Sequence, residues 1–439
     1  MIVDDGKISV WLATGVGLAA IIGAGIFVLS GTAIALAGAN SLLAFLLVGV
    51  VAIIIALEIG ELGSILPNTK GASYSYTYKA FGSELGFITG IVQYFSYSSG
   101  IAVIALGFGS YLADIIGVSG ASSLIFAMAL IIAMTVVNLA GIKSAVKTDF
   151  VLVVIKVVVL LAFIGFALML TLGSGFNTGN FQTTAQQGGV SSLFAASIVI
   201  FFAYAGFQTV STFTSRVRGG PRKAAISILL SVVISIALYV LVVFCLMLLL
   251  PTSQYSISAD PLAFALQRVN APQWLMILVG LGALIATASA TIARMLSSSR
   301  VLYQMAADKL LPKPLRKFDI KRDVAPNALL LSSAIGIAML FTGDIYQIAA
   351  ISNFGLLFAY MMASLALVHY RKRHVIGQFK MPGYPYLPAI AIVALLLFMI
   401  GMPIISLIVG VILILSLIII YYFLVEKEHK KTIRRKLFK

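Results

Sequence analysis

Long apolar runs separated by short polar segments dominate the hydropathy pattern of this chain. Stretches such as 42–57 and 404–422 contain no charged residue. The runs are continuously apolar and too long for the strands of a membrane β-barrel. They instead predict about twelve membrane-spanning α-helices of roughly 20 residues or more. These lie near 11–37, 41–66, 84–113, 121–141, 148–172, 190–214, 224–250, 273–305, 326–342, 346–370, 384–402 and 404–425.

The composition of the chain supports this interpretation. Its 439 residues are 61% hydrophobic and only 10% charged, which indicates an all-α integral membrane protein. Asp4 and Asp5 precede the first apolar run where a signal peptide would carry basic residues, so we expect the first helix to be retained. The single cysteine, Cys245, lies in an apolar run and excludes an internal disulfide.

The distribution of basic residues predicts the orientation of the chain in the membrane. All but three of the 30 lysines and arginines fall on one side if both termini are cytoplasmic. The exceptions are Arg268, expected outside, and Lys156 and Arg294, expected within the bilayer. We therefore expect a multi-pass protein of the cell (cytoplasmic) membrane. The net charge of +16, including the basic tail after residue 426, indicates attraction to anionic lipid headgroups and no nucleic-acid partner.

Small residues interrupt two of the predicted helices at mid-membrane. Gly23 and Gly25 flank Ala24 in the first span, and Gly206 follows Ala205 in the sixth. Glycine is also common where membrane helices pack closely, so one such site alone carries little information. Interruptions at corresponding positions in the two halves of a chain, as in its first and sixth spans, are typical of a transporter binding site. There the opened helices present free backbone groups to a ligand.

The paired interruptions also predict the organisation of the chain. An even number of spans with both ends inside permits a five-plus-five inverted repeat followed by two extra helices. The predicted parts are the cytoplasmic N-terminus at 1–10, the first repeat at 11–172, the second repeat at 190–370, the extra helices at 384–425 and the cytoplasmic tail at 426–439.

Several sequence motifs resemble those of the amino acid, polyamine and organocation permeases. They occur in the family's order over most of the chain, from about residue 8 to residue 330, as Ile21-Ile22-Gly23-Ala24-Gly25-Ile26-Phe27, Glu61-Leu62-Gly63-Ser64, Phe202-Ala203-Tyr204-Ala205-Gly206-Phe207 and Arg300-Val301-Leu302-Tyr303. The resemblance implies a LeuT-like fold with discontinuous first and sixth helices. Gln208 departs from the pattern, because relatives often carry an acidic residue there, and glutamine can only form hydrogen bonds.

The resemblance also implies where an amino acid would bind. The backbone amides of Ala24, Gly25 and Ile26 would hold its carboxylate, which agrees with the affinity of helix N-termini for anions. The carbonyls near Ile21, Ile22, Phe202 and Ala205 would hold its ammonium. Phe202 stands where the family places an aromatic gate, although ordinary packing explains it equally well.

Lys156 is the most informative charged residue of the predicted spans. It lies about 12 Å into the fifth span, among valines and isoleucines, where an ionisable residue is a functional candidate by default. The alternatives are that its long stem reaches the cytoplasm or that it forms a structural pair. By resemblance to proton-coupled relatives, including archaeal ones, Lys156 would replace the sodium ion of other members. Its partners would then be the carbonyl of Ala19 and the hydroxyl of Ser289.

The remaining chemistry of the sequence is sparse. A sodium site would require two neighbouring hydroxyl groups on the eighth span, and the pair Ala288-Ser289 contains only one hydroxyl. The proton is therefore the expected coupling ion. The chain shows no nucleotide loop and no zinc spacing, which argues against an enzyme, a metal site, an organic cofactor or an ATP-driven pump. We expect Arg294 to reach the membrane surface or to pair with Glu58 or Glu61.

Together these features predict a secondary transporter that imports amino acids by alternating access, coupled to protons through Lys156. An exchanger or polyamine carrier is the alternative within transport. A non-transporting amino acid sensor is the alternative from another class, and the short basic tail argues against it.

Overall fold

The computed structural model describes residues 8–67, 69, 71–118, 122–141, 146–184 and 188–425. These ranges contain helices, turns and two isolated β-bridges, and no strand. The predicted tail at 426–439 and residues 1–7 lie outside them. The elements are α1 (Val10–Ile21), α2 (Ala24–Ala37), α3 (Asn40–Ile65), α4 (Ser73–Phe81), α5 (Ser83–Ile116), α6 (Ser122–Ala140), α7 (Val146–Ser174), η1 (Thr178–Phe181), α8 (Val190–Tyr204), η2 (Phe207–Arg216), α9 (Gly220–Leu249), η3 (Thr252–Gln254), α10 (Pro261–Arg268), α11 (Gln273–Ala307), η4 (Lys313–Arg316), α12 (Pro326–Met339), α13 (Ile345–Lys372), α14 (Tyr386–Ile400), α15 (Ile404–Ile420) and η5 (Tyr421–Val425).

The lengths of these helices confirm an all-α membrane protein. Nine helical segments of the described chain are long and apolar enough to cross a membrane, and α1 with α2 forms one bent span more. The predicted spans at 326–342 and 384–402 correspond to α12 and α14, which are apolar but shorter. The number of twelve crossings and the inverted repeat therefore stay predictions.

Both predicted helix breaks are present. The α1 helix ends at Ile21, and α2 begins at Ala24 with its axis bent by 47°. The α8 helix ends at Tyr204, Ala205 is extended, and Gly206 has a φ of +129°, a value that a residue with a Cβ rarely adopts. Beyond Gly206 the chain continues as the tighter 3₁₀ helix η2, so the predicted sixth span changes its helix type at the break.

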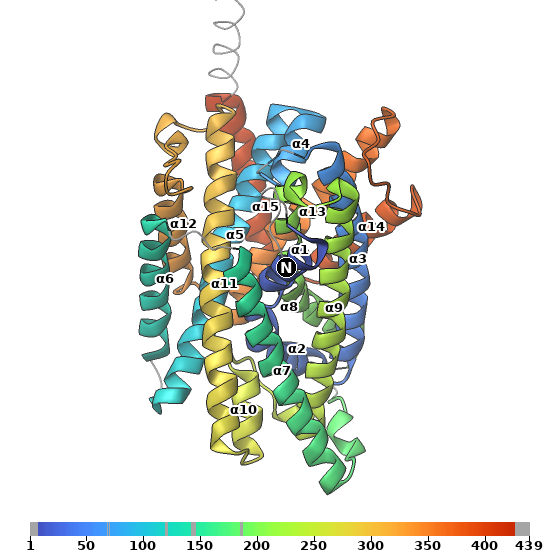
Figure 1. The fold of residues 1–439 in the computed structure, drawn as a ribbon, viewed down its shortest axis with the longest axis vertical. Helices are drawn as coiled ribbons and strands as arrows, with labels where there is room; N and C mark the ends of the chain where they lie inside the picture. The colour runs from blue at the N-terminus through green and yellow to red at the C-terminus, as the bar shows by residue number, and fades with distance from the viewer. Residues whose placement is uncertain are drawn as a thin grey trace, which may run out of the picture.

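The helices on either side of the breaks form the centre of the bundle. The α2 helix packs on α8, α1 packs on α9 and η2, and α11 and α13 both pack on α5. In Figure 1 most helices run along the long axis of the molecule, with α4 at its upper end and α10 at its lower end. The hydropathy pattern did not predict α4 or α10, because both are short and amphipathic.

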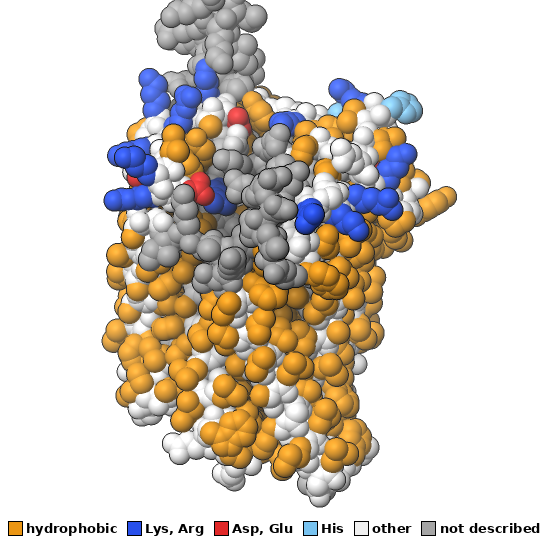
Figure 2. Space-filling view, in the orientation of Figure 1, with side chains coloured by type: hydrophobic (Ala, Val, Ile, Leu, Met, Phe, Trp, Pro, Cys, Tyr) orange, Lys and Arg blue, Asp and Glu red, His pale blue; other side chains and the backbone are white. Residues whose placement is uncertain are grey.

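The surface separates an apolar body from a basic end. Figure 2 shows lysines and arginines gathered toward the upper end, where α4 lies, above a body covered by hydrophobic side chains. The outer helices expose large aliphatic residues, among them Val154 and Val158 of α7 and Ile408 and Ile412 of α15. Lipid tails are the solvent that such a surface requires.

Candidate functional site

A small cavity lies where the two helix breaks meet. Its volume is about 50 Å³, which is room for a few water molecules. The α1–α2 break, the α8–η2 break, α5 and α11 all contribute to its wall. The lining residues are Ala20, Ile21, Gly23, Ala24, Gly25, Tyr97, Ile104, Phe202, Ala205, Gly206, Gln208, Thr209, Ala290, Ala293, Arg294 and Ser297.

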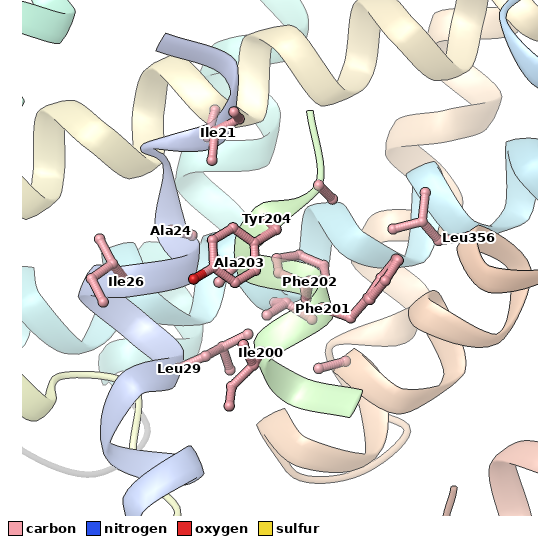
Figure 3. Packing of buried hydrophobic residues seen from close by; sticks show 14 of the residues in the cluster. Ile21, Ala24, Ile26, Leu29, Ile200, Phe201, Phe202, Ala203, Tyr204 and Leu356 are labelled. Carbon is pink, nitrogen blue, oxygen red and sulfur yellow. The ribbon is translucent and has the colours of Figure 1, made fainter. Parts of the chain in front are cut away.

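Most residues of the predicted substrate site belong to this wall. Ile21, Ala24, Gly25, Phe202 and Ala205 line the cavity, together with the break residues Gly23 and Gly206. The other two, Ile22 and Ile26, are fully buried beside it. Figure 3 shows Ala24 at the start of α2 next to Ala203 and Tyr204 of α8. The structure thus brings together segments almost 180 residues apart in the sequence.

The start of α2 lies at the cavity and has backbone amides without a hydrogen-bond partner among the described residues. The first turn of a helix has no intrahelical acceptors for its amides, and no described side chain caps α2 at Gly23. No hydrogen bond of the described residues involves the amides of Ala24, Gly25 or Ile26. The positive end of the α2 dipole adds to these donors, so this turn is suited to an anion.

The carbonyls at the breaks are partly occupied by the protein itself. The Ile21 carbonyl accepts a hydrogen bond of 2.7 Å from the Gly23 amide and one of 2.9 Å from the Tyr239 hydroxyl. The same hydroxyl lies 3.3 Å from the Ala203 carbonyl. The Phe202 carbonyl accepts from the Ala205 amide at 3.2 Å. Tyr239 of α9 therefore ties the end of α1 to the end of α8.

We expect Tyr239→Phe to weaken substrate binding as well as the fold. The change removes the hydroxyl that donates to the Ile21 carbonyl and lies near the Ala203 carbonyl, which costs about 1 kcal/mol of stability. The ends of α1 and α8 then no longer share a hydrogen-bond partner. The KM for uptake should rise several-fold. Tyr255→Phe is the matched control, because the buried Tyr255 hydroxyl donates to the Leu246 carbonyl at 2.6 Å outside the cavity wall. An equal rise of KM in both variants would contradict this role.

Lys156 contacts the last turn of α1, just before the first break. Its side chain is 0% exposed, although Val154 and Val158 beside it are 45% and 54% exposed. The structure therefore does not favour the alternative in which the stem reaches the cytoplasm. The Lys156 ammonium donates to the Ala19 carbonyl at 3.3 Å, in the last turn of α1, where carbonyls lack intrahelical donors. The Ser289 hydroxyl donates to Ala286 in its own helix at 3.0 Å.

The side chains of Gln208, Gln93, Tyr97 and Tyr360 form a buried hydrogen-bonded cluster at the second break. The site predicted from the sequence did not include this cluster. The Gln208 carbonyl oxygen accepts from the Tyr360 hydroxyl at 2.5 Å and from the Gly206 amide at 3.3 Å. Its amide nitrogen donates to the Tyr97 hydroxyl at 2.8 Å, which also accepts from Gln93 at 3.0 Å. Glutamine can donate and accept at once, which fits it to this position between Gly206 and α5.

Arg294 is the second residue that the predicted site lacked, and the prediction of its partners was wrong. Glu61 pairs with Arg371 instead, and Glu58 accepts from the Ser364 hydroxyl at 2.5 Å. Arg294 lines the cavity, with its guanidinium carbon 4.5 Å from the centre of the Phe202 ring. The sequence did place Arg294 within the bilayer, and an intramembrane charge was the signal that could have identified it as a site residue.

Comparison with known proteins shows the family of the chain. The model of the family described as Amino acid permease matches residues 14–438, which is nearly the whole chain. The chain belongs to the Amino acid permease family. The permease is 25% identical to the branched-chain amino acid permease BcaP of Bacillus subtilis, over 94% of this chain and 92% of that protein. It is 26% identical to the methylthioribose transporter of the same organism, over 88% and 86%.

Solved structures show the same fold. The manganese transporter of Eremococcus coleocola superimposes on the permease with a TM-score of 0.61, covering 96% of this chain and 95% of that one. The sequence identity is 14%, so this likeness concerns the fold alone. The predicted resemblance to the amino acid, polyamine and organocation permeases, and the predicted LeuT-like class of fold, are thus confirmed, and the relatives are transporters.

Proposed function

We propose that this permease imports amino acids together with protons by alternating access. The observation that carries the proposal is that one helix break borders both the cavity and Lys156. Ala24 and Gly25, which begin α2, line the cavity, while the Ala19 carbonyl near the end of α1 accepts a hydrogen bond from the Lys156 ammonium. The name of its Bacillus relative, a branched-chain amino acid permease, supports amino acids as the substrate class.

The two ends of the break suit the two charges of an amino acid. The substrate carboxylate would accept from the amides of Ala24, Gly25 and Ile26, at the positive end of the α2 dipole. The substrate ammonium would be held by carbonyls of Ile21, Ile22, Phe202 and Ala205, which end the preceding helices. The cavity of about 50 Å³ must widen to admit an amino acid, and widening between the break segments is the motion that alternating access requires.

Lys156 links this motion to a proton. In its protonated form the ammonium satisfies the Ala19 carbonyl and meets the negative end of the α1 dipole. Loss of the proton weakens both interactions and frees the end of α1 to move. The affinity for substrate would fall at the same step, because α1 and α2 share the break.

We also propose an orientation. The basic upper end of Figure 2 would face the cytoplasm together with both termini, as the positive-inside rule requires. The protein would then lie in the cell membrane, with the tail at 426–439 near anionic headgroups.

Uptake of labelled amino acids into proteoliposomes tests the function. We expect the accumulation of amino acid to rise when the outside is more acidic than the inside. We also expect uptake to occur without countersubstrate inside the proteoliposomes. Uptake that needs countersubstrate inside would instead indicate an exchanger, and binding without flux would indicate a sensor.

Lys156→Met tests the coupling. The substitution keeps an unbranched side chain but removes the proton site, so we expect uptake driven by the pH gradient to fall to near the background. Exchange of labelled for unlabelled substrate should persist. Lys223→Met is the matched control, because Lys223 is exposed near the start of α9. Undiminished gradient-driven uptake in Lys156→Met would contradict proton coupling through this residue.

A further inference from the structure

Arg294 is a charged group in the cavity wall, and two aromatic rings lie close to its guanidinium. Its guanidinium carbon lies 4.5 Å from the ring centre of Phe202 and 5.6 Å from that of Tyr97. Gly100 of α5 makes room for the side chain, since a Cβ there would lie 2.9 Å from the Arg294 Nη2 atom. The aromatic faces attract and orient the planar cation, but they do not neutralise it.

No carboxylate in the described part of the chain compensates this charge. Among the residues that the structure describes, Arg294 forms no ion pair and no hydrogen bond, whereas Arg371 pairs with Glu61 and Arg300 pairs with Asp323. An uncompensated charge in a low-dielectric site is costly. An intramembrane charge of this kind is a functional-site candidate by default, and in this cavity a ligand would supply the opposite charge.

The place of Arg294 fits a ligand that also reaches the start of α2. Ala290 of α11 packs against the break, because a Cβ on Gly23 would lie 2.8 Å from the Ala290 Cβ. Arg294 follows Ala290 by one helical turn, about 6 Å along α11, on the same face. Both residues line the cavity. A ligand of a few carbons would span from the α2 amides to the guanidinium.

We propose that the substrates of this permease are acidic amino acids, and that Arg294 binds the side-chain carboxylate. This inference rests on the proposed function, in which the α2 amides take the α-carboxylate. The guanidinium fork then donates to the second carboxylate in a bidentate pair, the geometry for which arginine is suited. The same positive charge repels lysine and arginine as substrates.

Competition between isosteric amino acids tests the proposal. In proteoliposomes we expect glutamate to compete with labelled substrate ~10- to 100-fold better than glutamine, the ratio expected for one hydrogen-bonded charge. Aspartate and asparagine should differ in the same direction. Arg294→Met should remove this preference, so that glutamate and glutamine compete equally and weakly. Arg294→Lys, which keeps the charge without the fork, should retain part of the preference.

Arg300→Gln is the matched control. It removes an arginine of the same helix whose partner is Asp323 outside the cavity wall, and it should leave the glutamate preference unchanged. Equal competition by glutamate and glutamine in the unaltered protein, or an unchanged preference in Arg294→Met, would overturn the proposal. Uptake of neutral amino acids alone would keep the proposed function and reject acidic substrates.

A binding measurement separates the two hypotheses if no uptake occurs. Absence of any amino acid flux would contradict the proposed function. Thermal stabilisation of the purified protein by glutamate and not by glutamine, lost in Arg294→Met, would still support binding of a second carboxylate. Stabilisation by neither amino acid would reject it.

Discussion

We expect Gly25→Ala to abolish uptake and to lower the thermal stability of the protein. A Cβ at this position would overlap the Cα and Cβ of Ala203 in α8, and the Cα belongs to a backbone that cannot turn aside as a flexible side chain can. Overpacking of this kind costs about 1–3 kcal/mol or more. It also pushes apart the two break segments whose amides and carbonyls form the proposed site. Uptake in proteoliposomes and the melting temperature in detergent measure the two effects.

Glycines elsewhere in the membrane provide the control for Gly25→Ala. A Cβ on Gly165 of α7 would have no described atom within 4 Å, and the residue is exposed on the outer face. Gly165→Ala should leave uptake unchanged and slightly favour the helix. Normal uptake by Gly25→Ala would show that the two breaks need not touch for transport. A loss of uptake in both variants would show that the effect is not specific to the break.

Glu61→Ala is expected to cause the largest loss of stability. The Glu61 carboxylate is 0% exposed and accepts from Arg371 at 2.5 and 2.8 Å and from the Met381 amide at 2.8 Å. These contacts fasten the segment between α13 and α14 to the end of α3. Removing the carboxylate leaves the Arg371 guanidinium, only 14% exposed, without its partner. Breaking such a buried pair costs about 3–5 kcal/mol, which a thermal or chemical denaturation curve would detect.

An exposed ion pair and a double variant complete this experiment. Asp323→Ala removes the partner of Arg300, but their side chains are 48% and 37% exposed, so water compensates the loss and the cost stays below about 1 kcal/mol. Glu61→Leu combined with Arg371→Met should be more stable than Glu61→Ala, because no buried charge remains unpaired. A double variant no more stable than the single one would argue against the unpaired charge as the cause.

The hydropathy pattern predicted helix positions well and helix types less well. The predicted spans 84–113 and 273–305 match α5 and α11 to within a few residues, because continuous apolar runs must be helical in a bilayer. The change from α-helix to the 3₁₀ helix η2 after Gly206 was not predicted. Gln208, in the first turn of η2, bonds to Gly206 and to Tyr97 of α5, and no hydropathy pattern records such contacts.

Lys156 and Arg294 show the limit of the sequence for the site itself. Both are single charges in apolar runs, and the sequence marked both as intramembrane. Lys156 was assigned a carbonyl near Ala19 by resemblance, and the structure has this contact, while its role in coupling stays a prediction. Arg294 was assigned to glutamates on other helices. Only the packing of α11 against α5 and the first break turns it toward the cavity.

The order of residues was enough to establish a helical membrane protein and to locate the two segments where its helices break. Lipid allows one kind of spanning structure for such apolar runs, and glycine marks where the backbone departs from it. The packing of the helices was needed to show that the breaks touch, that Tyr239 and Gln208 hold them, and that Arg294 faces the space between them. These facts depend on distances between helices far apart in the chain, which no local pattern records.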